Sequence, residues 1–264
     1  MTEGVPAYRV ASEATVKNRY CVVIPVINEG RRIQLQLERM AELAIPDLAD
    51  IIIVDGGSSD GSLSQDLLDR CGVNTLLVKT GPGKLSAQLR CGYDFALKRE
   101  YAGIVTIDGN NKDDPDTMAD FVAALDAGYD FVQASRYIPG GVAENTPLLR
   151  TIAIRLIHAP LLSLASGFRW TDTTQGYRAY SRALLTDPRV GIFRDVFASY
   201  ELLAYLSYRA PRLGYRCIEL PTARRYPAGE KAPTKISPLA GNLKLMTTLL
   251  KACTGRYNPE GERP

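Results

Sequence analysis

Short apolar runs alternate with longer amphipathic segments along the first half of the chain. The runs are continuously apolar and rich in β-branched residues, which is typical of buried strands. They occupy residues 20–27, 50–55, 74–79, 103–108 and 129–137. The segments between them carry apolar residues at helical spacing over ten or more positions. Buried strands that alternate with helices predict an α/β fold, in which helices cover both faces of a mostly parallel sheet.

The polar residues that could form a site follow these strands. In a parallel sheet, ligands bind beyond the carboxyl ends of the strands. The segments expected there are 25–29, 55–62, 80–86 and 108–116; three of them carry acidic groups and two are rich in glycine. A single loop of this kind is equally well explained as a polar turn with helix caps. Several on one rim favour a binding site.

The last of these segments concentrates negative charge. Four carboxylates fall within the nine residues from Asp108 to Asp116, and they repel one another unless positive charge lies among them. The segment is therefore either a solvated loop or a place where a cation and a charged ligand bind. Asp108, Asn110 and Lys112 alternate along it, so an extended chain would point all three to the same face.

The composition narrows the class of protein. The chain has 264 residues, of which 45% are hydrophobic and 23% charged, and a net charge of +3. This is enough for one large domain with a core and gives no reason to expect nucleic-acid binding. Five scattered cysteines without a C-x-x-C pair predict a cytoplasmic protein with no disulfide framework and no zinc site. We expect neither a signal peptide nor a membrane span, because no uninterrupted apolar stretch is long enough. The single histidine, His158, lies in a helical pattern and is expected to be structural.

Two common nucleotide-binding motifs are excluded by their spacing. The stretch "GPGKLS" resembles the end of a P-loop, but Val78 stands where that motif has a glycine, and Leu85 where it has Ser or Thr. The fingerprint G-x-G-x-x-G is absent after the first strand. Lys84 is then either a solvated residue at a helix start or a phosphate contact.

Six segments resemble, in the right order, the family-2 glycosyltransferases of the glycosyltransferase-A fold, and most of all their polyprenyl-phosphate (dolichyl-phosphate) branch. They read VVIPVINEGRRI, IIIVDGGSSDGS, TIDGNNKDDPD, ASRYIPGG, DTTQGYRAYSRALL and YELLAYLSYRAPRLGYRCIELP. The resemblance covers roughly residues 20–257. It implies a Rossmann-like catalytic domain over residues 20–225. Residues 1–19 would form an N-terminal extension, and residues 226–264 an acceptor loop and an amphipathic helix.

The resemblance also implies an inverting transferase that takes a hexose from a UDP- or GDP-linked sugar. Asp55 would hold the base or ribose, and Asp108 with Asn110 would bind Mg²⁺ or Mn²⁺. Asp172 and Glu201 are candidate catalytic bases for a hydroxyl acceptor, with helix capping or pairing with arginine as their alternative roles. The donor-binding residues implied are Pro25, Asn28, Glu29, Asp55, Gly56, Lys84, Asp108, Gly109, Lys112 and Arg136, and Arg178 is a further catalytic candidate that would pair with phosphate oxygens.

Three positions depart from the family pattern. Asn110 stands where the family usually has a second aspartate, and Lys112 where the polyprenyl-phosphate branch often has a glutamine. Gly56 replaces the second acid of the second-strand motif. An ammonium beside Asp108 makes a weaker dication site but a good diphosphate site, so we expect a lowered metal requirement. The alternative is that Lys112 points to solvent and pairs with a neighbouring aspartate.

The second half of the chain is expected to bind the acceptor. Residues 144–170 and 233–259 have apolar-basic helical patterns, and residues 223–235 are strongly basic. Such helices bind anionic membrane surfaces; the alternative is that they pack on the core or on a second subunit, as in a homo-oligomer. The acceptor is then a polyprenyl phosphate at the inner face of the membrane, or a hydroxyl of a small soluble molecule or carbohydrate. A non-catalytic nucleotide-sugar-binding module is the third interpretation.

Overall fold

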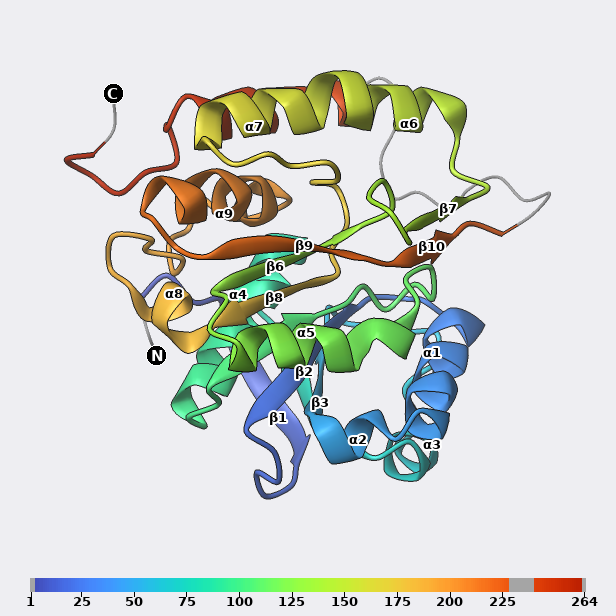
Figure 1. Ribbon diagram of the computed structural model, residues 1–264. Helices are drawn as coiled ribbons and strands as arrows, with labels where there is room; N and C mark the ends of the chain where they lie inside the picture. Colours follow the sequence, from blue (N-terminus) through green and yellow to red (C-terminus); the bar gives the residue numbers. More distant parts are fainter. Residues whose placement is uncertain (1–2, 228–239, 263–264) are drawn as a thin grey trace.

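A twisted sheet of eight strands forms the centre of the molecule (Figure 1). The computed structural model describes residues 3–227 and 240–262. The strand order is β1-β4-β3-β2-β5-β8-β6-β9, and β1 and β8 run antiparallel to their neighbours while the other pairs are parallel. The α/β fold with a mostly parallel sheet is therefore confirmed. The strands of this sheet are β1 (Tyr8–Glu13), β2 (Tyr20–Val26), β3 (Asp50–Asp55), β4 (Val73–Lys79), β5 (Gly103–Thr106), β6 (Phe131–Ser135), β8 (Arg178–Ser181) and β9 (Cys217–Pro221).

Helices cover both faces of the sheet, as the sequence pattern predicts. One cluster of buried apolar side chains joins the sheet to α1, α2, α3 and α5, and a second joins it to α4, α8 and α9. A short 3₁₀ helix, η1 (Pro115–Thr117), leads into α5. The helices of these layers are α1 (Arg31–Glu42), α2 (Ile45–Leu48), α3 (Gln65–Arg70), α4 (Leu85–Lys98), α5 (Met118–Asp126), α8 (Arg182–Thr186) and α9 (Glu201–Arg212).

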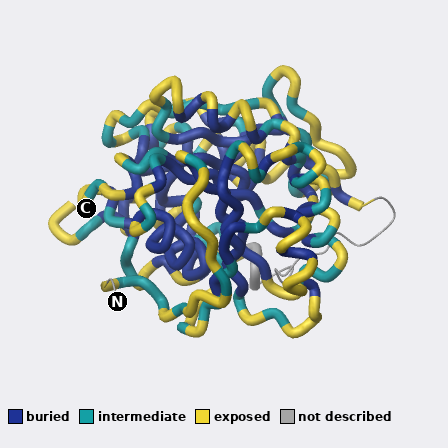
Figure 2. Tube along the Cα trace, turned by 90° about the horizontal axis from the view of Figure 1, so that it is seen from below, coloured by how far each residue is buried: buried dark blue, intermediate teal, exposed yellow. Residues whose placement is uncertain are grey.

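Alternate side chains of the central strand β2 serve the two cores. Val22 and Ile24 pack toward α1 and α5, whereas Cys21 and Val23 pack toward α4 and α9, as the two-residue period of a strand requires. Burying one such side chain fully contributes about 1.5–3 kcal/mol. Helix α4 lies so close to the sheet that a Cβ on Gly92 would stand 2.6 Å from Val23 Cγ1. Figure 2 shows the resulting buried centre.

A further set of helices lies over α9, at the top of Figure 1. Helix α6 (Leu148–Ala153), the π-helical turn η2 (Ile154–His158) and α7 (Ala159–Ser166) follow one another without a break, and α10 (Ala240–Cys253) packs against α7 and α9. We call these four elements the helical roof. Within the described part of the chain, Leu148–Ser166 is the one helix long and apolar enough to cross a membrane, by length and composition alone. Arg150 and Arg155 interrupt this helix, so it is not an uninterrupted apolar stretch, and the expectation of no membrane span stays a prediction.

The segments outside the expected catalytic domain contribute to the same fold. Residues 1–19 were expected to be an extension, yet they supply β1, which pairs with β4 at the sheet edge. A separate parallel pair joins β7 (Val142–Glu144) to β10 (Ala223–Arg225) and brings Arg224 beside Asp113 through an isolated bridge. The basic positions Lys231 and Lys235 lie outside the described residues. The division of the chain at residue 225 stays a prediction.

Candidate active site at the carboxyl ends of the strands

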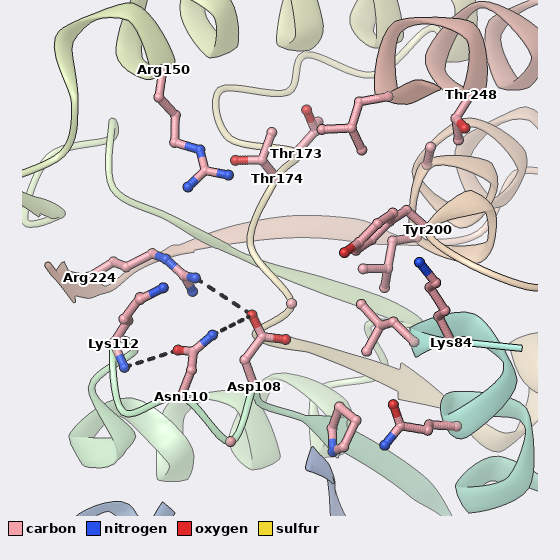
Figure 3. Close-up of a pocket in the computed structure, with 18 of the residues that line it drawn as sticks. Lys84, Asp108, Asn110, Lys112, Arg150, Thr173, Thr174, Tyr200, Arg224 and Thr248 are labelled. Carbon is pink, nitrogen blue, oxygen red and sulfur yellow. Dashed lines mark hydrogen bonds and ion pairs between the residues drawn. The ribbon is translucent and has the colours of Figure 1, made fainter. Parts of the chain in front are cut away.

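A cavity of about 1010 Å³ lies between the carboxyl ends of the central strands and the helical roof (Figure 3). Eight of the donor- and metal-binding candidates from the strand ends line it. We call the following set the donor rim. It comprises Pro25, Glu29, Gly56, Lys84, Asp108, Gly109, Asn110 and Lys112. The prediction that the strand-end loops converge on one cavity is therefore confirmed for these residues, while their roles toward a ligand stay predictions.

Asn28 and Asp55 shape the rim without lining the cavity. The Asp55 carboxylate accepts hydrogen bonds from the backbone N–H of Ser58 at 2.8 Å and from its hydroxyl at 2.6 Å. The Asn28 side-chain oxygen accepts from the backbone N–H of Ser59 at 2.8 Å. The two residues thus tie the loop after β3 to the loop after β2. The base or ribose contact expected of Asp55 stays a prediction.

Packing against Gln88 explains why residue 56 is a glycine, where the resemblance leads us to expect an acid. The side-chain amide of Gln88, in α4, donates to the backbone carbonyls of Val26 and Val54, each at 2.9 Å. A Cβ on Gly56 would lie 2.9 Å from that amide nitrogen. A larger residue would therefore push Gln88 away from the ends of β2 and β3. Sequence reasoning missed Gln88, since a glutamine inside a helical pattern carries no signal of this role.

The acidic turn after β5 is neutralised by arginines from distant parts of the chain. Arg224 contacts Asp108 at 3.6 Å and forms a buried ion pair with Asp113. The other two carboxylates also pair with arginines: Arg225 contacts Asp114 at 2.5 Å, and Arg39 contacts Asp116 at 2.9 Å. Burial lowers the pKa of Arg224, but the charges of Asp113 and Asp108 outweigh it and raise that pKa above its ordinary value. The turn is therefore built around positive charge.

Three cations surround the ring of Tyr226 where the donor rim meets the helical roof. The Lys112 ammonium lies 5.1 Å from the ring centroid, and the guanidinium groups of Arg224 and Arg150 lie 5.8 and 5.9 Å from it. Arg150 also donates to the Tyr226 hydroxyl at 2.8 Å. Burial raises the pKa of Tyr226, but Arg224 and Arg150 outweigh it and lower that pKa. Burial and the nearby Arg224 also lower the pKa of Lys112.

This junction has the chemistry of a phosphate-binding site. The side chains of Lys112, Arg150 and Arg224 line the cavity and can donate hydrogen bonds to phosphate oxygens. The sequence placed Arg150 and Arg224 in the acceptor region but could not show that they meet Lys112. Backbone hydrogen bonds from β10 to the acidic turn bring Arg224 there: Asp114 N–H donates to the Ala223 carbonyl, and Arg225 N–H to the Lys112 carbonyl.

Where the acidic turn joins the donor rim, it offers a dication one carboxylate, that of Asp108, and one amide, that of Asn110. The Asn110 amide nitrogen lies 3.5 Å from Asp108 Oδ2, and the Asn110 oxygen accepts from the backbone N–H of Lys112 at 3.2 Å. In residues 3–227 and 240–262, no group of three His, Cys, Asp or Glu side chains could hold a metal ion. Since Mg²⁺ is commonly held by one or two carboxylates together with substrate phosphates, these residues fit a weak site that a bound diphosphate would complete.

Arg136 and Asp172 form a buried ion pair outside the cavity lining. Arg136 donates to Asp172 at 2.6 and 3.0 Å, and their side chains are 1% and 0% exposed. Burial raises the pKa of Asp172, but Arg136 outweighs it and holds that pKa below its ordinary value. This ion pair is the alternative role of Asp172, pairing with arginine. The donor contact of Arg136 and the base role of Asp172 stay predictions. Their neighbours Thr173 and Thr174 line the cavity instead.

Arg178 and Glu201 are also engaged within the protein. The fully buried Arg178 donates to the backbone carbonyls of Thr173, Gln175 and Leu203 at 2.7–2.9 Å. These bonds give Arg178 a structural role, and its phosphate contact stays a prediction. Glu201, at the start of α9, accepts from the backbone N–H of Ser199 at 2.5 Å and does not line the cavity. This is the capping alternative to a catalytic base.

Comparison with known proteins places the chain in a family. The model of glycosyl transferase family 2 matches residues 21–188. Polyprenol monophosphomannose synthase from Mycolicibacterium smegmatis is 32% identical over 216 residues, which cover 79% of this chain and 78% of that protein. Dolichyl-phosphate hexose transferase from Haloferax volcanii is 33% identical over 150 residues, which cover 57% of this chain and 60% of that protein. The chain belongs to glycosyl transferase family 2 and is a glycosyltransferase.

Solved structures support the same fold. Glucosyl-3-phosphoglycerate synthase from Mycobacterium tuberculosis, in complex with uridine diphosphate, matches with a TM-score of 0.56 and 19% identity, covering 89% of this chain and 79% of that chain. The same enzyme has been solved with Mn²⁺, uridine diphosphate and glucosyl-3-phosphoglycerate, and matches with a TM-score of 0.55 and 18% identity over the same shares. At this level of identity the likeness bears on the glycosyltransferase-A fold alone.

Proposed function

We propose that this glycosyltransferase moves a hexose from a nucleotide-diphosphate sugar to a polyprenyl phosphate, with inversion at the anomeric carbon. The observation that carries the proposal is the division of the cavity. Polar and charged groups of the donor rim form one wall, apolar side chains of the helical roof form the other, and Lys112, Arg150 and Arg224 lie where the two walls meet. A phosphate with an apolar tail matches this arrangement.

The roof supports an apolar acceptor on both of its sides. Its inner side lines the cavity with Leu149, Ile154, Ile157, Leu245 and Met246. Its outer side leaves large apolar side chains in solvent, namely Leu148 (72% exposed), Leu156 (71%), Leu164 (86%) and Leu243 (70%). Large apolar side chains exposed together on one set of helices are typical of an interaction surface or a membrane contact. We therefore propose that the protein works in the cytoplasm, peripherally at the inner face of the membrane.

The chemistry follows from the charge of the acceptor. A phosphate oxygen is anionic near neutral pH, so it can attack the anomeric carbon without a general base. The new bond forms as the bond from sugar to diphosphate breaks, and the nucleoside diphosphate leaves with the bonding electrons. Arg150 and Arg224 would orient the attacking phosphate, and Lys84 and Lys112 would stabilise the charge that gathers on the leaving diphosphate.

Asp108, with the side-chain oxygen of Asn110, would hold Mg²⁺ or Mn²⁺ at this site. When bound, such an ion supplies a Lewis acid to the diphosphate. Asp108 has a fixed place for this work because Gly176 packs directly against it: a Cβ on Gly176 would stand 2.2 Å from Asp108 Oδ1. Any larger residue at Gly176 would displace the carboxylate from the rim.

The test is transfer from labelled UDP- and GDP-hexoses to a short-chain, water-soluble polyprenyl phosphate. Arg150→Gln should raise the KM for this acceptor at least about tenfold, since it removes a hydrogen bond to a charged group. Arg155→Gln is the matched control, because Arg155 lies on the same roof but is exposed and does not line the cavity. Transfer to a soluble hydroxyl acceptor, with none to the polyprenyl phosphate, would overturn the proposal in favour of a soluble acceptor.

A further inference from the structure

We propose that Lys112 is a built-in cation for the donor diphosphate, so that the nucleotide binds this protein without a dication. The inference rests on the proposed function and concerns the departure at the acidic turn. Residue 112 is a lysine, so the chain itself places an ammonium beside Asp108 and Asn110. A compact ammonium can contact phosphate oxygens without strict geometry.

The first observation is that the potential metal ligands are already held by other groups. Asp108 Oδ2 lies 3.5 Å from the Asn110 amide nitrogen and 3.6 Å from an Arg224 nitrogen. The Asn110 oxygen accepts from the backbone N–H of Lys112. A dication at this point would displace the first two contacts and compete for the third, and it would meet the repulsion of the Arg224 guanidinium.

The second observation is the place of the Lys112 side chain. Lys112 is 7% exposed and lines the cavity together with Asp108 and Asn110, and Figure 3 shows all three rising from the same turn. The solvent alternative is excluded by this burial. The aspartates of that alternative, Asp113, Asp114 and Asp116, form ion pairs with Arg224, Arg225 and Arg39.

The third observation is the balance of charge at the junction. Three cations, Lys112, Arg150 and Arg224, lie around Tyr226, whereas Asp108 and Asp113 are the two carboxylates in ion-pair contact with Arg224. Among the described residues, these three cations outnumber the two carboxylates in contact with Arg224. Such a site attracts a diphosphate by itself and holds a dication only weakly unless the diphosphate is present.

The experiment is calorimetric titration of UDP and GDP into the protein, in EDTA and in Mn²⁺. The wild type should bind one of the two nucleotides in EDTA, and Mn²⁺ should improve the Kd by less than about tenfold. Lys112→Gln should lose at least about tenfold in EDTA and regain affinity in Mn²⁺, because it restores an oxygen ligand. Lys112→Met removes the charge without adding a ligand, so it should lose affinity in EDTA and regain less in Mn²⁺.

Lys17→Gln is the matched control, because Lys17 is exposed and precedes β2. It therefore lies at the amino ends of the parallel strands, whereas the cavity lies at their carboxyl ends. This variant should bind both nucleotides as the wild type does. Binding by the wild type only in Mn²⁺, with Lys112→Gln unchanged, would overturn the role of Lys112 and leave the proposed function intact. If neither nucleotide bound in either buffer, both proposals would fall.

Discussion

The donor rim and the helical roof invert the usual distribution of side chains. Where the donor rim meets the roof, charged groups are buried: Lys112 is 7% exposed, and the neighbouring Arg224 and Asp113 side chains are 8% and 0% exposed. On the roof, apolar groups are exposed: Leu164 is 86% exposed and Leu149 is 81% exposed. Buried charge is costly unless it is paired, and large exposed apolar surfaces are uncommon on monomers. The difference teaches that each region is completed by a ligand of its own kind.

Among the proposed substitutions, we expect the loss of the Asp108 carboxylate from the donor rim to reduce the transfer rate most. Asp108→Ala should reduce transfer by at least about a hundredfold, the scale of losing one preorganised electrostatic contact at a reacting group. Thermal unfolding should change little, since Asp108 lies at a strand end and its Arg224 partner keeps Asp113. The measurement is initial rate with labelled donor, beside a melting curve.

Asp116→Ala is the control for that substitution. Asp116 belongs to the same turn and pairs with Arg39 on the surface, where both side chains are 46% exposed. Exposed ion pairs contribute little to stability, so this variant should transfer normally. Near-normal turnover by Asp108→Ala would show that the rim carboxylate does not serve the reaction.

Asp55 tests whether the rim holds the nucleoside. Asp55→Ala should weaken donor binding roughly tenfold to a hundredfold, because it removes a charged hydrogen-bond acceptor and releases the Ser58 loop. The turnover number at saturating donor should fall less, since contacts to base and ribose are the same before and during reaction. Titration of the nucleotide decides the point, and Asp69→Ala, on the exposed surface of α3, is the control. Equal affinities would rule out this role.

The sequence predicts most of the rim and little of the junction. Continuous apolar runs gave the central strands, and the residues after them line the cavity as expected. The four-residue strand β8 was missed as a strand because it lies inside a polar motif and inserts antiparallel between β5 and β6. The Arg224–Asp113 and Arg136–Asp172 pairs join residues 111 and 36 positions apart. Residue types and local spacing cannot reveal such pairs, so the sequence could not show that Arg136 and Asp172 contact each other.

His158 titrates where the roof meets the cavity. Its Nδ1 lies 2.6 Å from the Thr173 hydroxyl, and burial, followed by the charge of Arg178, lowers the pKa of His158 to about 4. The unfolded chain, with an ordinary pKa near 6.5, binds a proton first as the pH falls. Stability from His158 is therefore present above the unfolded pKa and is lost as the pH falls toward 4. Between pH 7 and pH 5 this loss should amount to about 2 kcal/mol.

His158→Gln should remove that part of the pH dependence while keeping a hydrogen-bonding side chain. The measurement is urea unfolding of wild type and variant at both pH values. The comparison is the change of unfolding free energy with pH, since carboxylates elsewhere contribute equally to both proteins. If both proteins lost the same unfolding free energy between pH 7 and pH 5, His158 would be protonated in the folded protein at pH 5, and its pKa would not be lowered.

Substitutions on the outer face of the helical roof should have the smallest effect on transfer. We expect it only when the acceptor is embedded in a membrane. Leu156→Ser combined with Leu164→Ser removes apolar surface that is 71% and 86% exposed, so the fold should lose little stability. Membrane binding scales with the apolar area that enters the interface. The apparent KM for a polyprenyl phosphate in anionic vesicles should therefore rise several-fold, while transfer to the short-chain soluble acceptor stays unchanged.

The matched control for the roof is Val10→Ser combined with Leu35→Ser, which removes apolar side chains that are 43% and 42% exposed on β1 and α1. This variant should bind vesicles as the wild type does. Sedimentation of wild type and roof variant tests the competing occupant, a second copy of the chain. A wild-type dimer that the roof substitutions dissociate, with vesicle binding unaltered, would assign the exposed leucines to a subunit interface. If both proteins sedimented as monomers and the roof variant bound vesicles more weakly, the exposed leucines would contact the lipid. The apolar side of the cavity would then continue into the membrane, which holds the polyprenyl chain of the acceptor.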